Sequence, residues 1–196
     1  MSPPRRSAES TVELRKRLVE HALSVIEREG ADALTMRSLA TEADCSVGLV
    51  YKVFTDRREL VEAILERELA ELVELLDRLM DRAGRYTVGA NLAWFANQFI
   101  ASPAAPLVRE AAATEQDSGS PPESHHGMEG LEAAVGRYLS AEQERSRVRP
   151  DVDTEAIGAL VAAAVHNLVL AGAGWPRPSE ALLRRRMDGL ADAISP

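Results

Sequence analysis

The chain has 196 residues, of which 45% are hydrophobic, 23 are Lys or Arg and 31 are Asp or Glu, giving a formal net charge of −8. This acidic balance excludes a general nucleic-acid coat, and the single cysteine, Cys45, excludes an intramolecular disulfide framework. No apolar run is long enough to cross a bilayer and the first ten residues lack the apolar centre of a signal peptide, so we expect a cytoplasmic protein without membrane contact.

The charge is unevenly distributed along the chain. Residues 1–60 contain ten Lys or Arg and ten Asp or Glu, so the whole net charge of −8 arises in the remaining residues. A neutral N-terminal segment on an acidic body indicates two regions with different partners.

Apolar residues recur at helical spacing along most of the sequence, and no segment has the alternation typical of a strand. We therefore expect an all-α protein of about nine helices. They are predicted at residues 11–29, 36–43, 47–54, 57–82, 87–101, 106–114, 128–146, 154–172 and 180–194. Several begin at a capping residue: Ser10, Thr35, Ser46, Asp56, Asp153 and Ser179. The clearest loop is "QDSGSPPESHHG", residues 116–127.

The second and third predicted helices are separated only by Asp44 and Cys45. So short a connection forces the two helices to cross steeply, and one residue is expected to have φ > 0, which Asp tolerates better than most. Preceded by a supporting helix, this pair predicts a helix-turn-helix, whose second helix enters the major groove of DNA.

The predicted third helix has two different sides. Val50 and Phe54 are four residues apart and are expected to face the core, which leaves Gly48, Tyr51 and Lys52 on the outside. This pattern predicts a helix held by its apolar side and free to contact DNA with the other.

Basic residues nearby are expected to contact the DNA backbone. Arg57 lies in the first turn of the fourth helix and Arg37 early in the second. Arg5 and Arg6 lie on a Pro-flanked N-terminal arm that is suited to phosphate or minor-groove contacts.

The segment "ALTMRSLATEADCSVGLVYKVFTDRREL" resembles the signature of tetracycline-repressor-type (TetR) transcriptional regulators, and the resemblance covers about 47 residues from Leu14 to Leu60. It departs from the family pattern at Asp44, where glycine is usual, and at Leu49, where a hydroxyl is frequent. The resemblance implies a repressor that binds a palindromic operator as a homodimer and responds to a small-molecule effector. It implies DNA contacts at eight positions: Thr35, Arg37, Val47, Gly48, Leu49, Tyr51, Lys52 and Arg57.

The predicted domains are a DNA-binding domain over residues 1–56, with a flexible arm over 1–9, and a regulatory domain over 57–196 that carries ligand binding and dimerisation. The helix after Asp153 is apolar nearly all round and needs cover on every side, which favours a four-helix interface with a second copy. The predicted interface residues are Gly158, Ala162, Val165, Val169, Leu183, Met187, Leu190 and Ile194.

A ligand pocket in the regulatory domain is predicted to combine aromatic and apolar walls with a few polar anchors. Its candidate residues are Trp94, Phe95, Gln98, Phe99, Met128, Leu131, Tyr138, His166 and Asn167. Ordinary core packing is the alternative for each of the aromatic side chains.

No motif indicates catalysis or metal binding. The sequence has no Gly-rich phosphate loop, no G-x-S-x-G and no H-E-x-x-H, and His125 and His126 have no further ligands at metal spacing. We therefore expect no enzyme activity, no cofactor and no metal. The alternative function is a helical small-molecule-binding or protein-interaction module that does not bind DNA.

Overall fold

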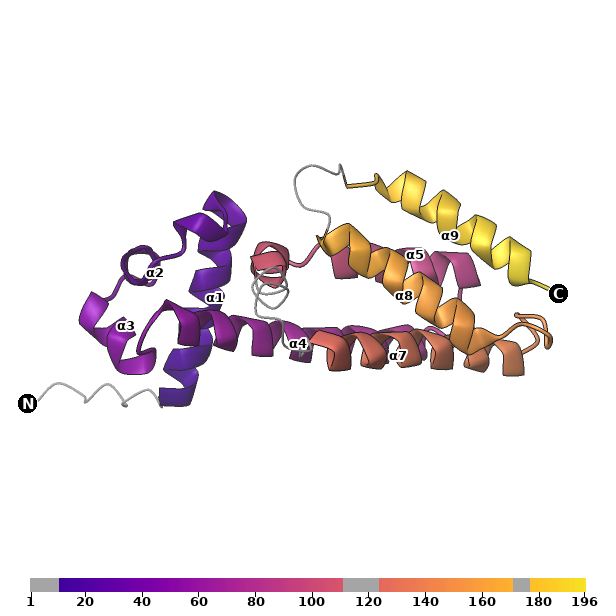
Figure 1. The fold of residues 1–196 in the computed structure, drawn as a ribbon, viewed down its shortest axis with the longest axis horizontal. Helices are drawn as coiled ribbons and strands as arrows, with labels where there is room; N and C mark the ends of the chain where they lie inside the picture. The colour runs from indigo at the N-terminus through magenta and orange to yellow at the C-terminus, as the bar shows by residue number, and fades with distance from the viewer. Residues whose placement is uncertain (1–10, 111–123, 171–176) are drawn as a thin grey trace, which may run out of the picture. The chain divides into compact units, whose positions relative to one another are not determined.

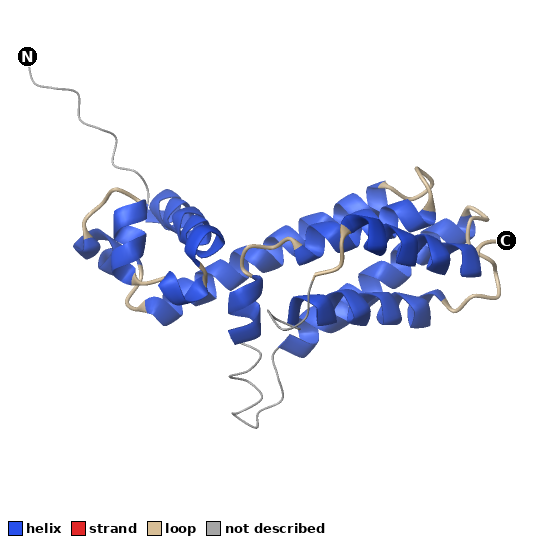
Figure 2. Cartoon of the chain, turned by 90° about the horizontal axis from the view of Figure 1, so that it is seen from above, coloured by secondary structure: helices blue, strands red, loops and turns tan. Residues whose placement is uncertain are grey.

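The structure, a computed structural model, describes residues 11–110, 124–170 and 177–196, except for the side chains of residues 124–128. Every element in these ranges is a helix, and no strand occurs in them (Figures 1 and 2). The predicted all-α class is confirmed. None of the helices in the described part of the chain combines the length and the hydropathy that a membrane span requires.

The helices follow the predicted order. The first part of the chain forms α1 (Thr11–Glu29), the 3₁₀ helix η1 (Ala31–Ala33), α2 (Met36–Glu42) and α3 (Val47–Val53). The rest forms α4 (Arg57–Asp81), α5 (Val88–Ile100), a helical stretch at 105–110, α7 (Ser124–Glu144), α8 (Thr154–Leu170) and α9 (Glu180–Ile194). The predicted arm over 1–9, the Ser10 cap and most of the loop at 116–127 lie outside the described residues.

The chain divides into two compact units, Met1–Arg67 and Glu68–Pro196. The division falls inside α4. Leu60, Ala63 and Ile64 in its first turns are buried outside the core of the second unit, whereas Leu75 and Leu79 further along α4 belong to that core. The one helix α4 therefore contributes to both units.

The beginning of α7 differs from the prediction. We expected this helix to start at residue 128, after the Ser/His/Gly-containing loop, but α7 begins at Ser124. Extending a helix that already exists costs far less than starting one, so a turn of low helix propensity can be added in front of a strongly helical segment.

Two close crossings hold the second unit together: α7 packs against α8, and α5 packs against α9 (Figure 1). Where α7 meets α8, a Cβ atom on Gly158 would lie 2.5 Å from the backbone N of Gly136 and 2.6 Å from its Cα. Where α5 meets α9, a Cβ atom on Gly89 would lie 2.8 Å from the Cα of Asp188. Because only glycine permits such an approach, these positions set how closely each pair of helices packs.

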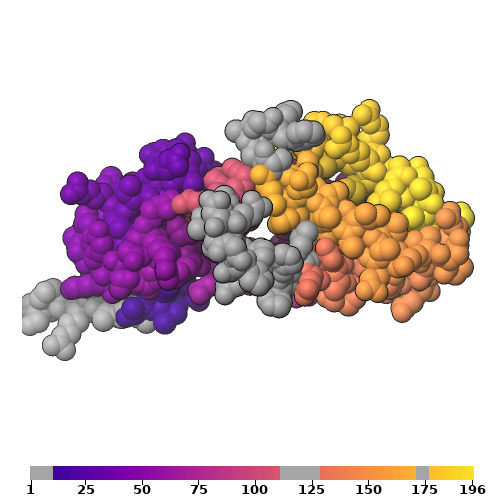
Figure 3. Space-filling model, viewed as in Figure 1, coloured from indigo at the N-terminus to yellow at the C-terminus, as the bar shows by residue number. Residues whose placement is uncertain are grey.

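The structure changes the interpretation of the predicted dimer residues. Leu190 is half-buried in the second unit of the same chain. The other seven are buried there: Gly158, Ala162, Val165, Val169, Leu183, Met187 and Ile194. The prediction covered the apolar α8 with a second copy, and in the structure α8 packs chiefly against α7 of the same chain. Contact with a second copy stays a prediction. Both α8 and α9 still present their other sides at the surface (Figure 3).

We expect Gly158→Ala to destabilise the second unit by about 1–3 kcal/mol, because the added methyl group meets the backbone of α7. Gly130→Ala is the matched control, since a Cβ there has open space around it and should stabilise α7 by about 0.5–1 kcal/mol. Urea unfolding followed by tryptophan emission measures both, because Trp94 packs against the core of this unit. If Gly158→Ala and Gly130→Ala unfolded at the same urea concentration, the close approach of α7 and α8 at Gly158 would be contradicted.

Candidate nucleic-acid interface

The predicted helix-turn-helix is formed by α2 and α3. Thr35 and Ser38 make a reciprocal capping box at the start of α2, with the Ser38 N–H donating to Thr35 Oγ1 at 3.0 Å and the Thr35 N–H to Ser38 Oγ at 2.8 Å. Ser46 caps α3 by accepting from the Leu49 N–H at 3.2 Å. Between the helices Asp44 has φ 47°, so the predicted left-handed residue is found where glycine is usual in the resembled family.

The third helix presents the two predicted sides. Val50 and Phe54 are both fully buried, at 0% exposure. Tyr51 is 52% exposed, and Gly48 and Lys52 are also exposed. We call Gly48, Tyr51 and Lys52 the outward face of α3. Val47 and Leu49, the two other predicted contacts on this helix, are half-buried.

A cluster that the sequence analysis did not identify fixes the C-terminal end of α3. The Arg15 guanidinium lies 4.6 Å from the centroid of the Phe54 ring and donates to Glu59 Oε1 at 2.9 Å and to the Val53 carbonyl at 3.4 Å. The other carboxylate oxygen of Glu59 accepts from the Thr55 N–H at 2.7 Å and its hydroxyl at 3.0 Å. These bonds connect α1, the end of α3 and the start of α4.

The charge of Glu59 is stabilised by this cluster. The Thr55 backbone N–H, followed by the Arg15 guanidinium and the Thr55 hydroxyl, holds the pKa of the Glu59 carboxyl below its ordinary value. Arg28 acts similarly on Glu42 at the end of α2, donating at 2.8 Å and lowering the pKa of that carboxyl.

The remaining predicted contacts lie on α2 and α4. Thr35 and Arg37 are exposed at the start of α2. Arg57, the first residue of α4, is half-buried, and its Nε donates to the Leu34 carbonyl at 3.1 Å. The structure thus brings the predicted residues together in the first unit, with the Arg57 guanidinium bonded to the backbone of its own chain.

The predicted pocket residues lie in different surroundings in the part of the chain that the structure describes. Phe95, Leu131 and Tyr138 are packed in the core of the second unit, and Trp94 and Phe99 are half-buried against it. The other candidates differ: Gln98 and Asn167 are exposed, His166 is half-buried with its pKa lowered by burial, and the Met128 side chain lies outside the description.

Tyr138 belongs instead to a buried polar cluster. Its hydroxyl donates to Glu142 Oε1 at 2.8 Å and accepts from Asn91 Nδ2 at 3.0 Å, and all three side chains are 0% exposed. Arg147 pairs with Glu142 at 3.3 Å, and the Gly84 N–H donates to the same carboxylate at 3.1 Å. Such a fully bonded network fixes α7 to α5 and to the segment between α4 and α5.

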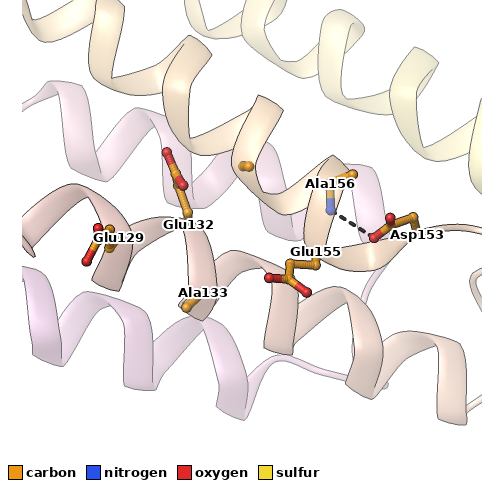
Figure 4. A pocket seen from close by; sticks show the side chains of 7 residues that line it. Glu129, Glu132, Ala133, Asp153, Glu155 and Ala156 are labelled. Carbon is orange, nitrogen blue, oxygen red and sulfur yellow. Dashed lines mark hydrogen bonds between the residues drawn. The ribbon is translucent and has the colours of Figure 1, made fainter. Parts of the chain in front are cut away.

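An open groove of about 440 Å³ lies elsewhere, between α7 and α8 (Figure 4). Its lining residues are Glu129, Glu132, Ala133, Asp153, Glu155, Ala156 and Ala159. One carboxylate oxygen of Asp153 accepts a hydrogen bond from the Ala156 N–H at 3.0 Å. The groove is therefore acidic, unlike the aromatic pocket predicted. No group of three His, Cys, Asp or Glu side chains suited to a metal ion occurs in the described part of the chain.

A known protein family matches part of the first unit. Residues 18–64 match the family described as "Bacterial regulatory proteins, tetR family". The HTH-type nicotine-responsive transcriptional repressor HdnoR of Paenarthrobacter nicotinovorans is 36% identical over 72 residues, which are 37% of this chain and 37% of HdnoR. The HTH-type transcriptional repressor KstR of Mycolicibacterium smegmatis is 34% identical over 76 residues, 39% of this chain and 35% of KstR. The chain thus matches less than two-fifths of the length of these curated relatives.

Solved structures share the fold over nearly the whole chain. A TetR-family transcriptional regulator from Cytophaga hutchinsonii superposes with a TM-score of 0.70 at 12% identity, covering 97% of this chain and 98% of that one. A transcriptional regulator from Saccharomonospora viridis in complex with choline superposes with a TM-score of 0.69 at 15% identity, covering 92% and 96%. At these identities the likeness concerns the fold alone.

We expect Glu59→Gln to remove a pH-dependent part of the stability of the first unit. Because the folded state lowers the pKa of Glu59, its contribution is fully present above the unfolded pKa near 4.5 and is lost as pH falls through the folded pKa. The variant should therefore melt below the parent at pH 7, and the difference should shrink towards pH 3. Methyl NMR signals of Val50 and Leu60 follow this unit selectively.

Glu62→Gln is the control for this prediction, since Glu62 lies on the same helix and pairs only with the exposed Arg58 at 3.0 Å in the described contacts. It should keep the pH dependence of the parent. A constant difference between Glu59→Gln and parent from pH 7 to pH 3 would show that the carboxylate charge is not what stabilises the cluster.

Proposed function

We propose that this chain, which belongs to the tetR family of bacterial regulatory proteins, is a sequence-specific DNA-binding transcriptional regulator that acts as a repressor in the cytoplasm. The observation that carries the proposal is the outward face of α3, which stands exposed while Val50 and Phe54 anchor the opposite side. A recognition helix needs an exposed face and a buried opposite side, because its exposed side chains contact base edges while its buried side chains fix the helix in place.

The proposed contacts divide into two kinds. Lys52 and Arg37 carry hydrogen-bond donors for base edges, and Tyr51 adds a ring and a hydroxyl. Thr35, Val47 and Gly48 lie at or close to the starts of α2 and α3, where backbone N–H groups favour phosphate. Leu49 has no hydrogen-bonding group and suits the methyl group of thymine.

Selection from a pool of random-sequence duplexes, at a low and a higher salt concentration, tests the function. Enrichment of a palindromic sequence that survives the higher salt is expected of an operator-binding regulator. Retention without any sequence preference, or no retention, would favour the alternative of a helical interaction module.

We expect Lys52→Ala to weaken binding to the selected sequence about 5- to 150-fold while changing binding to random duplex much less, because a lost base contact costs specificity. Arg137→Ala is the control, because Arg137 is exposed on α7 and its substitution removes one positive charge from the second unit. Titration of both variants with the selected and the random duplex measures the ratio. An unchanged ratio for Lys52→Ala would remove Lys52 from the reading residues.

We further propose that the regulator is a homodimer, because two recognition helices about 34 Å apart match the halves of a palindrome. The exposed side of α8 is the proposed contact surface. It carries Leu160, which is 67% exposed, among exposed small residues at helical spacing: Ala156, Ala163 and Ala164. A large apolar side chain flanked by small ones allows a second helix to approach closely.

We expect Leu160→Glu to shift the protein from dimer to monomer, because it would bury a charge in the proposed contact. Leu69→Glu on α4 is the control, since Leu69 is also exposed, at 54%, but lies on another helix. Sedimentation velocity over a range of concentrations measures the mass of each variant. A Leu160→Glu protein as dimeric as the parent would exclude this surface.

A small-molecule effector is proposed for the second unit. In support, one relative is named as nicotine-responsive and one structure of the same fold contains choline. Among the predicted pocket residues, Gln98 and Asn167 are exposed and Trp94, Phe99 and His166 are half-buried, so a ligand can reach these five. Phe95, Leu131 and Tyr138 lie in the core, where a ligand reaches them only if helices separate. The midpoint of tryptophan-monitored unfolding with nicotine or choline added tests this for two cationic ligands.

A further inference from the structure

Arg57 is bonded to the segment that leads into α2. Its Nε lies 3.1 Å from the Leu34 carbonyl oxygen and its Nη2 lies 3.5 Å from that of Ala31. The two carbonyls belong to the turn of η1, and Leu34 is the residue immediately before the Thr35 cap. The first residue of α4 thus holds the entry to a helix 23 positions earlier in the chain.

The entry to α2 is held from a second direction by Ser38. Its hydroxyl donates to the Ala33 carbonyl at 2.7 Å, while its backbone N–H donates to Thr35 Oγ1. Ser38 belongs to α2 itself, so this restraint is local. Arg57 supplies the restraint that comes from α4, and together they fix the backbone that carries Thr35 and Arg37.

Arg58 provides a contrast within the same turn. It is exposed and its Nε donates to Glu62 at 3.0 Å, one turn further along the same helix. Two adjacent arginines therefore have different surroundings: Arg57 spans to another element through backbone carbonyls, whereas the Arg58 contact stays within α4.

We propose that Arg57 is a positioning residue that fixes the start of α2 relative to α4, and so sets where Thr35 and Arg37 meet DNA, rather than a ligand of phosphate. This rests on the proposed DNA-binding function. The planar guanidinium has several N–H groups in a fixed fork and reaches both carbonyls, which the single ammonium of lysine does not. The role therefore requires arginine, whereas a phosphate contact requires only a positive charge.

Arg57→Lys separates the two roles because it keeps the charge, and Arg58→Lys is the matched control. In the free protein, hydrogen exchange of the Ser38 and Leu39 amides, which are bonded to Thr35, should become about tenfold faster in Arg57→Lys and stay unchanged in Arg58→Lys. Affinity for the selected duplex should also fall about tenfold, with random-duplex affinity and its salt dependence unchanged.

Ser38→Ala removes the local restraint at the same entry and should reproduce both effects, which keeps the test valid even if Arg57→Lys is poorly folded. The proposal is overturned if Arg57→Lys has the amide exchange rates and the DNA affinity of the parent while Arg57→Gln weakens binding to every duplex. In that case Arg57→Gln should also reduce the slope of log affinity against log salt concentration by about 0.9, as loss of one phosphate contact would. The exchange measurement uses no DNA, so a failure of the positioning role is distinguishable from a failure of the DNA-binding function.

Discussion

A helix of seven residues is too short to be stable in water by itself, so α3 depends on the burial of Val50 and Phe54. That single requirement organises the first unit. Ser46 caps the beginning of the helix, and Arg15 covers the Phe54 ring at its end while bonding to Glu59. Because these contacts involve the buried side and the two ends of α3, they leave its outward face exposed.

The proposed DNA-binding surface belongs to a protein whose net charge is −8. Two of its carboxylates, Glu42 and Glu59, are bonded to Arg28 and Arg15, which reduces their repulsion of phosphate. Lys52 and Arg37 remain exposed. The acidic excess lies in residues 61–196, and an acidic surface of this kind disfavours nonspecific attachment to nucleic acid.

Local features of the structure could be predicted well from the sequence. The caps at Thr35 and Ser46 and the left-handed Asp44 depend on a few neighbouring residues, and each was found where expected. The partner of α8 could not be predicted, because an apolar helix does not specify which helix covers it. Gly158 suited a contact with a second copy, but it meets Gly136 of the same chain.

Polar contacts between distant positions could not be predicted either, because the sequence pattern does not specify which residues meet. Arg15 and Glu59 are 44 positions apart, and Arg57 and Leu34 are 23 apart, so no periodicity relates them. The sequence predicted a phosphate contact for Arg57 because this residue is basic and begins a helix. Its carbonyl partners are backbone atoms, which leave no trace in the side-chain pattern of a sequence.

The glycine crossing of α7 and α8 also has a mechanical consequence for the second unit. Where two backbones touch, there are no side chains between them that can change rotamer and let the helices slide. α7 and α8 should therefore move as one rigid body, and α5 and α9, which meet at Gly89 in a similar way, as another. Any slow breathing of this unit would then open the layer between the two helix pairs and leave each pair intact.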